Sequence, residues 1–300
     1  MASSRFAPDR GLSFRMGLTL FLNGLVYVVL VLAIWYVLGG STAGVLLALL
    51  VSVGIFFFQW YASDSLAMRS IGGRVVSEQE APQLHLMVDR LCQLADMPKP
   101  RVAYSNSAVP NAFATGRSPN HSVVCVTRGL LETLEPKEVE AVLAHELSHV
   151  AHRDVTVMTV AGVTGVVAGL MMRSAFYAPR SRNNNGVPLQ LLFVLVGALV
   201  YALSFFLIRV LSRYRELAAD RAAALLTGAP STLGSALTKL SSETARIPAQ
   251  DLRASSAANH LAFIPAINGK DVRQLFSTHP SLEARLEQLA RISADLSRPS

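Results

Sequence analysis

Charged side chains are scarce in this chain of 300 residues. They make up 16% of it, against about a quarter in soluble proteins, whereas hydrophobic residues make up 51%. The shortage is local, because residues 16–63 contain no Asp, Glu, Lys or Arg at all. So long an uncharged stretch excludes an ordinary soluble domain there and is long enough for two membrane helices of about 20 residues each.

Cysteine is also scarce. Cys92 and Cys125 are the two in the chain, and they lie far apart without a Cys-x-x-Cys spacing. Two such cysteines need be neither a disulfide nor a zinc knuckle. We expect two buried or inert thiols in a reducing compartment.

Acidic residues are fewer than basic ones, and the net charge is +7. The chain has no recognised nucleic-acid-binding motif, and its basic residues are spread along the flanks of apolar runs. Arg209, Arg213 and Arg215 are expected to face anionic lipid headgroups. The predicted partners are therefore a lipid bilayer and no nucleic acid.

The uncharged stretch predicts a membrane hairpin. Gly39-Gly40-Ser41-Thr42 divides it into one span of about 16–38 and another of about 43–61. A secretory signal peptide is the competing interpretation, because three arginines precede the stretch. The apolar segment is too long for that and continues directly into a second one. Basic residues on both flanks, and none in the turn, predict that both ends of the hairpin are cytoplasmic.

The run Ala144-His-Glu-Leu-Ser-His149 has the spacing of a zinc hydrolase site. Two histidines four positions apart lie about 40° apart around a helix, so His145 and His149 can reach one ion. Glu146 lies about 100° from His145, beside the metal. Zinc lowers the pKa of its bound water to about 7, and a neighbouring carboxylate can take the proton. A surface helix with a local ion pair is the alternative.

A zinc hydrolase needs a third protein ligand. His152 is seven positions from His145, nearly two turns along the axis, which is too far. Glu216 and Asp220 share a helix face further along, so one could bind zinc while the other accepts the free ring N–H of a ligating histidine. An ordinary charged face, among neighbouring arginines, is the alternative for this pair.

Three motifs in this order resemble the HtpX-type membrane zinc metalloproteases of peptidase family M48, which are related to the Ste24 CAAX prenyl proteases. They are His145-Glu-Leu-Ser-His149 followed by Asp154, then Arg215-Glu216-x-x-x-Asp220, then Thr278-His279-Pro280. The resemblance covers most of the chain.

The resemblance also implies roles for individual residues. It implies one Zn²⁺ bound by His145, His149 and Glu216, with Glu146 as general base and Asp220 as a supporting residue. The His279 side chain is implied to lie near the metal, where it could stabilise an oxyanion.

Residues 101–104, 110–116 and 121–127 predict a strand followed by a β-hairpin. The segment Asn111-Ala112-Phe113-Ala114 matches one that precedes the active-site helix in the resembled family. A strand beside the zinc cleft would offer backbone groups to an extended peptide. A purely structural sheet is the alternative, and both can hold.

Two more apolar runs, 155–172 and 187–208, lie between the expected zinc ligands. If both span the membrane, three arginines of the intervening loop lie on the outer face, against the usual bias. If neither spans, two apolar helices remain to be covered. Because His149 and Glu216 must meet at one metal, we favour four spans.

These observations predict a mainly α protein, with integral membrane helices and a zincin-like (gluzincin) catalytic domain containing a small β-sheet or hairpin. The expected order is a cytoplasmic tail (1–15), a transmembrane hairpin (16–63), a first catalytic segment (64–154), a second apolar hairpin (155–208) and a second catalytic segment (209–300).

The predicted function is zinc-dependent endopeptidase cleavage of membrane or cytoplasmic proteins. The family resemblance further implies that the substrates are misfolded or damaged membrane proteins, in stress-linked quality control at the bacterial inner membrane. The active site is expected to face the cytoplasm. Ste24-type prenyl-protein cleavage and a non-catalytic, zinc-stabilised scaffold or chaperone are the alternatives.

Overall fold

The computed structural model describes residues 10–37, 41–174, 189–246 and 280–298. The chain divides into two compact units. The helical unit comprises residues 11–61 and 156–211, and the sheet unit comprises residues 62–155 and 212–300 together with the N-terminal residues to Arg10.

Four long helices build the helical unit or run through it. They are α1 (Arg10–Val37), α2 (Thr42–Ser70), α6 (Asp154–Ser174) and α7 (Leu189–Thr227). Each is long and apolar enough to cross a membrane. Large apolar side chains on them face outward, with Phe58 65%, Leu50 70% and Phe206 64% exposed. So much exposed apolar surface fits lipid rather than water.

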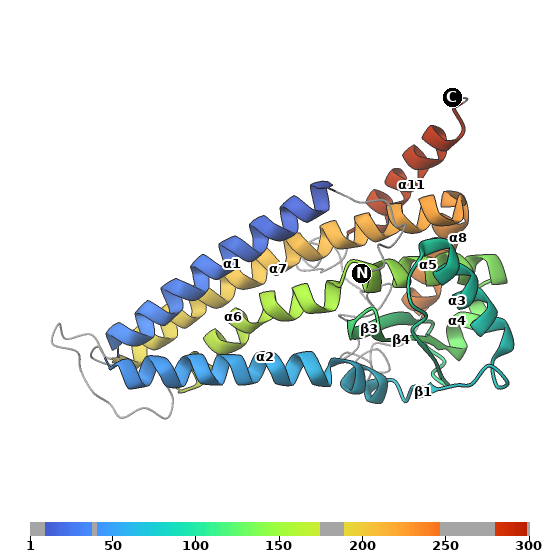
Figure 1. Ribbon diagram of the computed structural model, residues 1–300. Helices are drawn as coiled ribbons and strands as arrows, with labels where there is room; N and C mark the ends of the chain where they lie inside the picture. The colour runs from blue at the N-terminus through green and yellow to red at the C-terminus, as the bar shows by residue number, and fades with distance from the viewer. Residues whose placement is uncertain (1–9, 38–40, 175–188, 247–279, 299–300) are drawn as a thin grey trace. The chain divides into compact units, whose positions relative to one another are not determined.

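Small and polar residues join these helices. Figure 1 shows α1 and α7 side by side, and the Ser204 hydroxyl of α7 donates to Asn23 Oδ1 of α1 at 3.2 Å. The Asn23 amide in turn donates to the carbonyl of Ala161 on α6 at 2.6 Å. A Cβ at Gly197 of α7 would lie 3.1 Å from the carbonyl oxygen of Ala168, so α6 and α7 pack closely. Close backbone approach and interhelical hydrogen bonds replace the hydrophobic effect inside lipid.

The sheet unit contains a four-stranded sheet in the order β1-β2-β4-β3. Its strands are β1 (Arg74–Val75), β2 (Arg101–Ser105), β3 (Ala112–Ser118) and β4 (His121–Thr127). β4 pairs in parallel with β2 and antiparallel with β3. The central position of β4 explains its run of buried residues from Ser122 to Thr127. β3 is left as an edge strand.

Five helices complete the sheet unit in the described residues. They are α3 (Pro82–Ala95), α4 (Arg128–Thr133), α5 (Pro136–Ala151), α8 (Pro230–Arg246) and α11 (Leu282–Leu296). α5 begins with Pro136 and a capping box formed by Glu135 and Glu138. Its residues from Val139 to Val150 are buried except Glu140, so α5 is the central helix of this unit.

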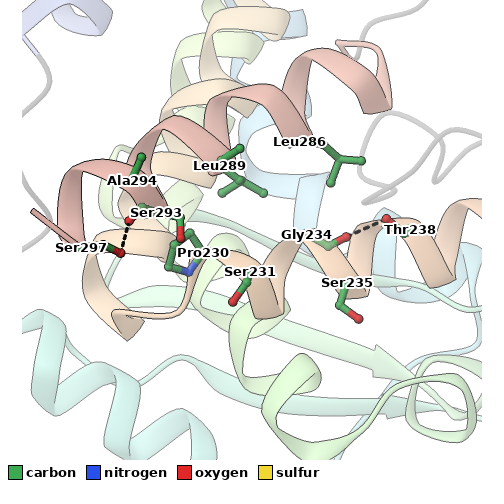
Figure 2. Close-up of a pocket in the computed structure, with 11 residues that line it drawn as sticks. Pro230, Ser231, Gly234, Ser235, Thr238, Leu286, Leu289, Ser293, Ala294 and Ser297 are labelled. Atoms are coloured by element: carbon green, nitrogen blue, oxygen red, sulfur yellow. Dashed lines mark hydrogen bonds between the residues drawn. The ribbon is translucent and has the colours of Figure 1, made fainter.

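The last helix, α11, packs on α8. A groove of about 580 Å³ lies between the two helices, and Figure 2 shows Leu286 and Leu289 of α11 on the side that faces Gly234 of α8. A Cβ on Gly234 would lie 3.3 Å from Leu286 Cδ2. The absence of a side chain at Gly234 therefore allows α11 to approach closely.

The predicted fold class is confirmed, with a mainly helical chain, four apolar helices and one small mixed sheet. Helix α7 crosses the expected segment boundary at residue 208 and continues to Thr227 without a break. The first helix-breaking residues after that boundary are Gly228 and Pro230, which explains where the helix ends.

Candidate metal centre and active site

Helix α5 carries the three buried side chains of the predicted motif. His145 is 1% exposed, Glu146 4% and His149 8%. The two imidazoles direct their Nε2 atoms toward one another at 3.1 Å, with ring planes 86° apart. Two nitrogen lone pairs therefore converge on one point.

The Glu216 carboxylate on α7 completes this arrangement. Its Oε2 lies 3.6 Å from His145 Nε2, and its Oε1 lies 3.6 Å from His149 Nε2. Ligands of a tetrahedral zinc ion are about 3.3 Å apart when each bond is about 2.0–2.1 Å long. Among the residues that the structure describes, these three form the only group of such side chains spaced to hold a metal ion.

The other ring nitrogen of each histidine faces a buried aspartate. His145 Nδ1 lies 2.9 Å from Asp220 Oδ1, and His149 Nδ1 lies 2.6 Å from Asp154 Oδ2. A carboxylate that accepts from the Nδ1 hydrogen holds the imidazole in the tautomer whose Nε2 is free to bind a metal.

Two arginines contact these aspartates. Arg285 of α11 forms a bidentate pair with Asp220, with Nε–Oδ2 at 2.7 Å and Nη2–Oδ1 at 2.6 Å. Arg215 Nε lies 2.9 Å from Asp154 Oδ2. The side chains of Arg285 and Arg215 are 3% and 12% exposed.

The charges of the site fit a divalent cation. Its buried carboxylates are Glu146, Asp154, Glu216 and Asp220. Arg285 and Arg215 pair with Asp220 and Asp154, so the Glu216 carboxylate is left to face a cation together with the two imidazoles. Because uncompensated charge is costly to bury, the residues present fit a divalent metal ion with nitrogen and oxygen ligands.

The same carboxylates favour positive charge at His145. Burial lowers the pKa of His145, but its hydrogen bonds with Asp220 and Glu216 outweigh that effect and raise the pKa to about 9. The pKa of His149 is lowered, chiefly by burial and with repulsion from His145, despite the Asp154 hydrogen bond. The site thus attracts a cation while keeping one imidazole neutral.

Glu146 is directed toward the edge strand. Its Oε2 accepts a hydrogen bond from the backbone N–H of Ala114 at 3.0 Å. Burial raises its pKa to about 8. A carboxyl group with a pKa near neutrality can both accept and return a proton, as a general base requires.

This combination of motifs and geometry matches a known family. The family model described as Peptidase family M48 matches residues 78–293 of the chain. The chain belongs to peptidase family M48. The predictions of family, enzyme class and membrane association are thereby confirmed, and this M48 chain is a membrane metallopeptidase.

Relatives cover nearly the whole M48 chain. It is 55% identical to Protease HtpX homolog 1 of Streptomyces coelicolor over 298 residues, which are 98% of this chain and 96% of the relative. It is 46% identical to the Protease HtpX homolog of Moorella thermoacetica, over 97% of this chain and 98% of the relative.

A solved structure shares the fold. The crystal structure of S. mikatae Ste24p aligns with a TM-score of 0.56 and 18% identity, over 92% of this chain. The M48 chain spans 65% of the length of that structure. At this identity the likeness concerns the fold alone.

The structure brings together most of the predicted site residues of this M48 chain. His145, His149 and Glu216 converge, Asp220 contacts His145, and Glu146 lies beside them. Their roles stay predictions. His279 lies outside the described residues.

The residues of the segment expected to bind substrate point in different directions. The Ala114 N–H points to Glu146, but the backbone N–H and C=O of Asn111 both pair with Thr127. The Phe113 side chain is buried against Ala67 and other residues on the opposite face of the sheet. Ala112 is also buried, on the face that packs against α5.

The sequence did not indicate a role at the metal site for three polar side chains, Asp154, Arg215 and Arg285. Asp154 was visible only as a member of the family motif. Arg215 was expected to face lipid headgroups, whereas it is nearly buried against Asp154. Arg285 lies in an amphipathic helix whose leucines dominate the pattern. Nothing in the spacing along the chain could show that Arg285 reaches Asp220, 65 positions earlier.

Proposed function

We propose that this M48 peptidase is a zinc-dependent endopeptidase that hydrolyses peptide bonds of misfolded or damaged membrane proteins. The observation that carries the proposal is the convergence of His145, His149 and Glu216 with Glu146 beside them. A set of two histidines and one glutamate is the ligand set of several zinc peptidases. The relatives are named as proteases, in agreement with this chemistry.

Each residue has a defined task in the proposed reaction. When bound, zinc supplies Lewis acidity that polarises the scissile carbonyl and acidifies water. Glu146 takes the proton of the attacking water and carries it to the leaving amine. Asp154 and Asp220 hold the imidazoles, and His279 is proposed to stabilise the oxyanion.

The edge strand β3 is the proposed binding surface for substrate. An extended peptide can add to an unpaired strand through backbone hydrogen bonds, which do not depend on its sequence. The strand passes Glu146 at Ala114, so a peptide along β3 would lie near the base. Such binding suits a peptidase that acts on damaged proteins of many sequences.

The proposed location is the bacterial cytoplasmic membrane, with the active site on the cytoplasmic side. Four helices are apolar enough to span. Basic residues flank the first hairpin on both sides and are missing from its turn, which favours cytoplasmic ends. The cost of this topology is three arginines, Arg173 in the last turn of α6 and Arg180 and Arg182 in the sequence that follows it.

The substitution Glu146→Gln tests the catalytic role. We expect casein cleavage by the full-length protein in detergent to fall roughly 10²- to 10⁴-fold, because the proton acceptor is lost. Zinc content, measured by elemental analysis, should stay at one ion per chain, because Glu146 is not a ligand. The matched control is Glu140→Gln on the same helix, where Glu140 lies 3.6 Å from Arg90 and away from the cluster. Undiminished cleavage by Glu146→Gln would refute the assignment.

CAAX prenyl-protein cleavage is the second candidate, because the sequence motifs of this chain also resemble those of the related Ste24-type proteases. A farnesylated CAAX peptide tested beside casein separates the two. Cleavage of the prenylated peptide alone would favour the second candidate. If the fully metallated protein cleaves neither, the non-catalytic scaffold remains.

A further inference from the structure

The two histidines of the metal site are supported in the same way. Each Nδ1 faces one aspartate, and each aspartate in turn contacts one arginine. The first series is His145, Asp220 and Arg285, and the second is His149, Asp154 and Arg215. All six side chains are buried or nearly so. Two independent Arg–Asp–His series therefore converge on one point.

The arginines offset the cost of burying the two aspartates. A carboxylate that is buried behind an imidazole has a large desolvation cost, and it can rotate away from the ring. A guanidinium beside it compensates the charge, and a bidentate fork such as that of Arg285 on Asp220 also fixes the plane of the carboxylate. The orientation of the Asp then fixes the orientation of the imidazole, and with it the position of Nε2.

Helix α11 positions Arg285 at the metal site. α11 starts at a Ser281 N-cap and packs through Leu286 and Leu289 against Gly234 of α8, as Figure 2 shows. Gln288 donates to the carbonyl of Leu217 on α7 at 2.6 Å, so α11 is also tied to the helix that carries Glu216. Arg285 Nη1 lies 3.9 Å from Glu216 Oε2. Arg285 thus contacts both carboxylates of α7 that face His145.

The second series brings the first residue of α6 and a residue of α7 together at His149. Arg153 adopts φ of 57°, and this left-handed residue ends α5 and allows Asp154, the first residue of α6, to turn back against His149. Arg215 lies next to Glu216 on α7, about 100° around the helix. One turn of α7 therefore supplies both a metal-facing carboxylate and the arginine that holds Asp154.

We propose that Arg215 and Arg285 are positioning residues of the metal site, acting through Asp154 and Asp220 on the two histidines. The inference rests on the proposed function, because it assigns the histidines as zinc ligands. Each arginine reaches the Nδ1 side of its imidazole through an aspartate, so each acts on metal affinity and geometry rather than on the reacting atoms.

The two arginines differ in how they contact their aspartate. Arg285 uses two nitrogens on two oxygens, a fork that a lysine cannot reproduce. Arg215 contacts Asp154 through one nitrogen. We therefore expect lysine to replace Arg215 largely and Arg285 poorly.

Metal affinity of the full-length protein in detergent tests the proposal. The zinc dissociation constant is measured by competition with a chromophoric chelator for Arg285→Lys, Arg285→Gln, Arg215→Lys and Arg215→Gln. We expect both Gln variants and Arg285→Lys to bind zinc roughly 10- to 100-fold more weakly, the usual effect of losing a residue that supports a ligand. Arg215→Lys should stay close to the wild type.

The absorption spectrum of the Co²⁺-substituted protein reports ligand geometry without reference to activity. Arg285→Lys should shift or broaden the visible bands, because His145 is less well oriented, whereas Arg215→Lys should leave them unchanged. Guanidinium ions at millimolar concentration should restore zinc affinity to Arg285→Ala, and potassium ions at equal ionic strength should not. Restoration by both salts would contradict a guanidinium-specific role.

Two variants of α11 separate positioning from simple docking. Gln288→Ala removes a docking hydrogen bond, and Arg291→Lys changes an exposed residue paired with Glu287. Both should keep wild-type zinc affinity, although Gln288→Ala should melt at a lower temperature. If Gln288→Ala weakens zinc binding as much as Arg285→Lys does, or if all four arginine variants bind zinc like the wild type, the proposal is overturned. Casein cleavage by the wild type is measured in the same series. If the wild type cleaves casein normally, such a result overturns the positioning role and leaves the proposed function standing.

Discussion

At the scale of single residues, Glu138 shows how one side chain serves both local and tertiary structure. Its Oε2 accepts from the Glu135 N–H at 2.9 Å and so completes the capping box of α5. The same carboxylate accepts from Ser235 at 2.7 Å and from Lys239 at 2.8 Å on α8. The start of the active-site helix is thereby fixed to a helix that is distant in the sequence.

The ionisation of Glu138 predicts a pH dependence of stability. Burial raises its pKa, but hydrogen bonds from Lys239 and Ser235 outweigh burial and hold the pKa below the ordinary value of 4.5. The carboxylate therefore stabilises the fold fully above about pH 4.5, and this stabilisation is lost as the pH falls through the lower folded-state pKa. We expect Glu138→Ala to cost about 1–3 kcal/mol at pH 7. Thermal melts of the variant and the wild type should converge as the pH falls below 4.5.

The matched control for Glu138 is Glu132→Ala. Glu132 pairs with Arg128 on the surface of α4 and its side chain is 60% exposed. Exposed ion pairs contribute little, so this variant should melt close to the wild type. Equal destabilisation by the two substitutions would show that burial and the α8 contacts are unimportant.

At the scale of secondary-structure elements, α6 and α7 form an antiparallel pair held by small residues. Gly197 of α7 faces Met172 and the carbonyl of Ala168 on α6. The sequence predicted two apolar helices here, since length and hydropathy are properties of each segment alone. Which glycine lies at the contact required the structure, because α6 and the first half of α7 are apolar on every side, so that their sequences show no distinct buried face.

The substitution Gly197→Leu tests this contact. A Cβ at this position would lie 2.6 Å from Met172 Cγ, so the added side chain must separate the helices. We expect a loss of about 1–3 kcal/mol, the usual cost of overpacking, seen as a lower melting temperature in detergent. Gly169→Leu on α6 is the control, because a Cβ there meets nothing within 4 Å. A melting temperature that falls equally in both variants would argue against the contact.

At the scale of the whole molecule, the topology of the chain can be tested through its cysteines. Cys92 and Cys125 are buried, as expected from the sequence, and burial raises the pKa of each thiol to about 12. A buried thiol with so high a pKa does not react readily. A cysteine introduced at the surface can therefore be labelled selectively in the full-length protein.

The proposed topology predicts opposite labelling at two positions. Ser41 lies between α1 and α2, and Asn120 lies between β3 and β4; both are exposed. A membrane-impermeant maleimide should label Ser41→Cys in intact cells and Asn120→Cys only after the cells are permeabilised. The reverse pattern would place the metal site outside the cytoplasm and refute the proposed orientation.

The sequence by itself determined the elements of this protein and the chemistry of its central motif. Helical periodicity places His145 and His149 on one face, and uncharged length identifies membrane helices, because both depend only on residues close together in the chain. Glu216 and Asp220 share a face for the same reason, although family resemblance was needed to choose Glu216 as the ligand.

Only the tertiary structure decided how the site is supported. Arg285 reaches Asp220 because α11 packs on α8, and the Ala114 N–H reaches Glu146 because β3 is an edge strand beside α5. These contacts join residues that are distant in the sequence, and their partners have no fixed spacing from the motif. Long-range packing sets such distances, so no local pattern could have predicted them.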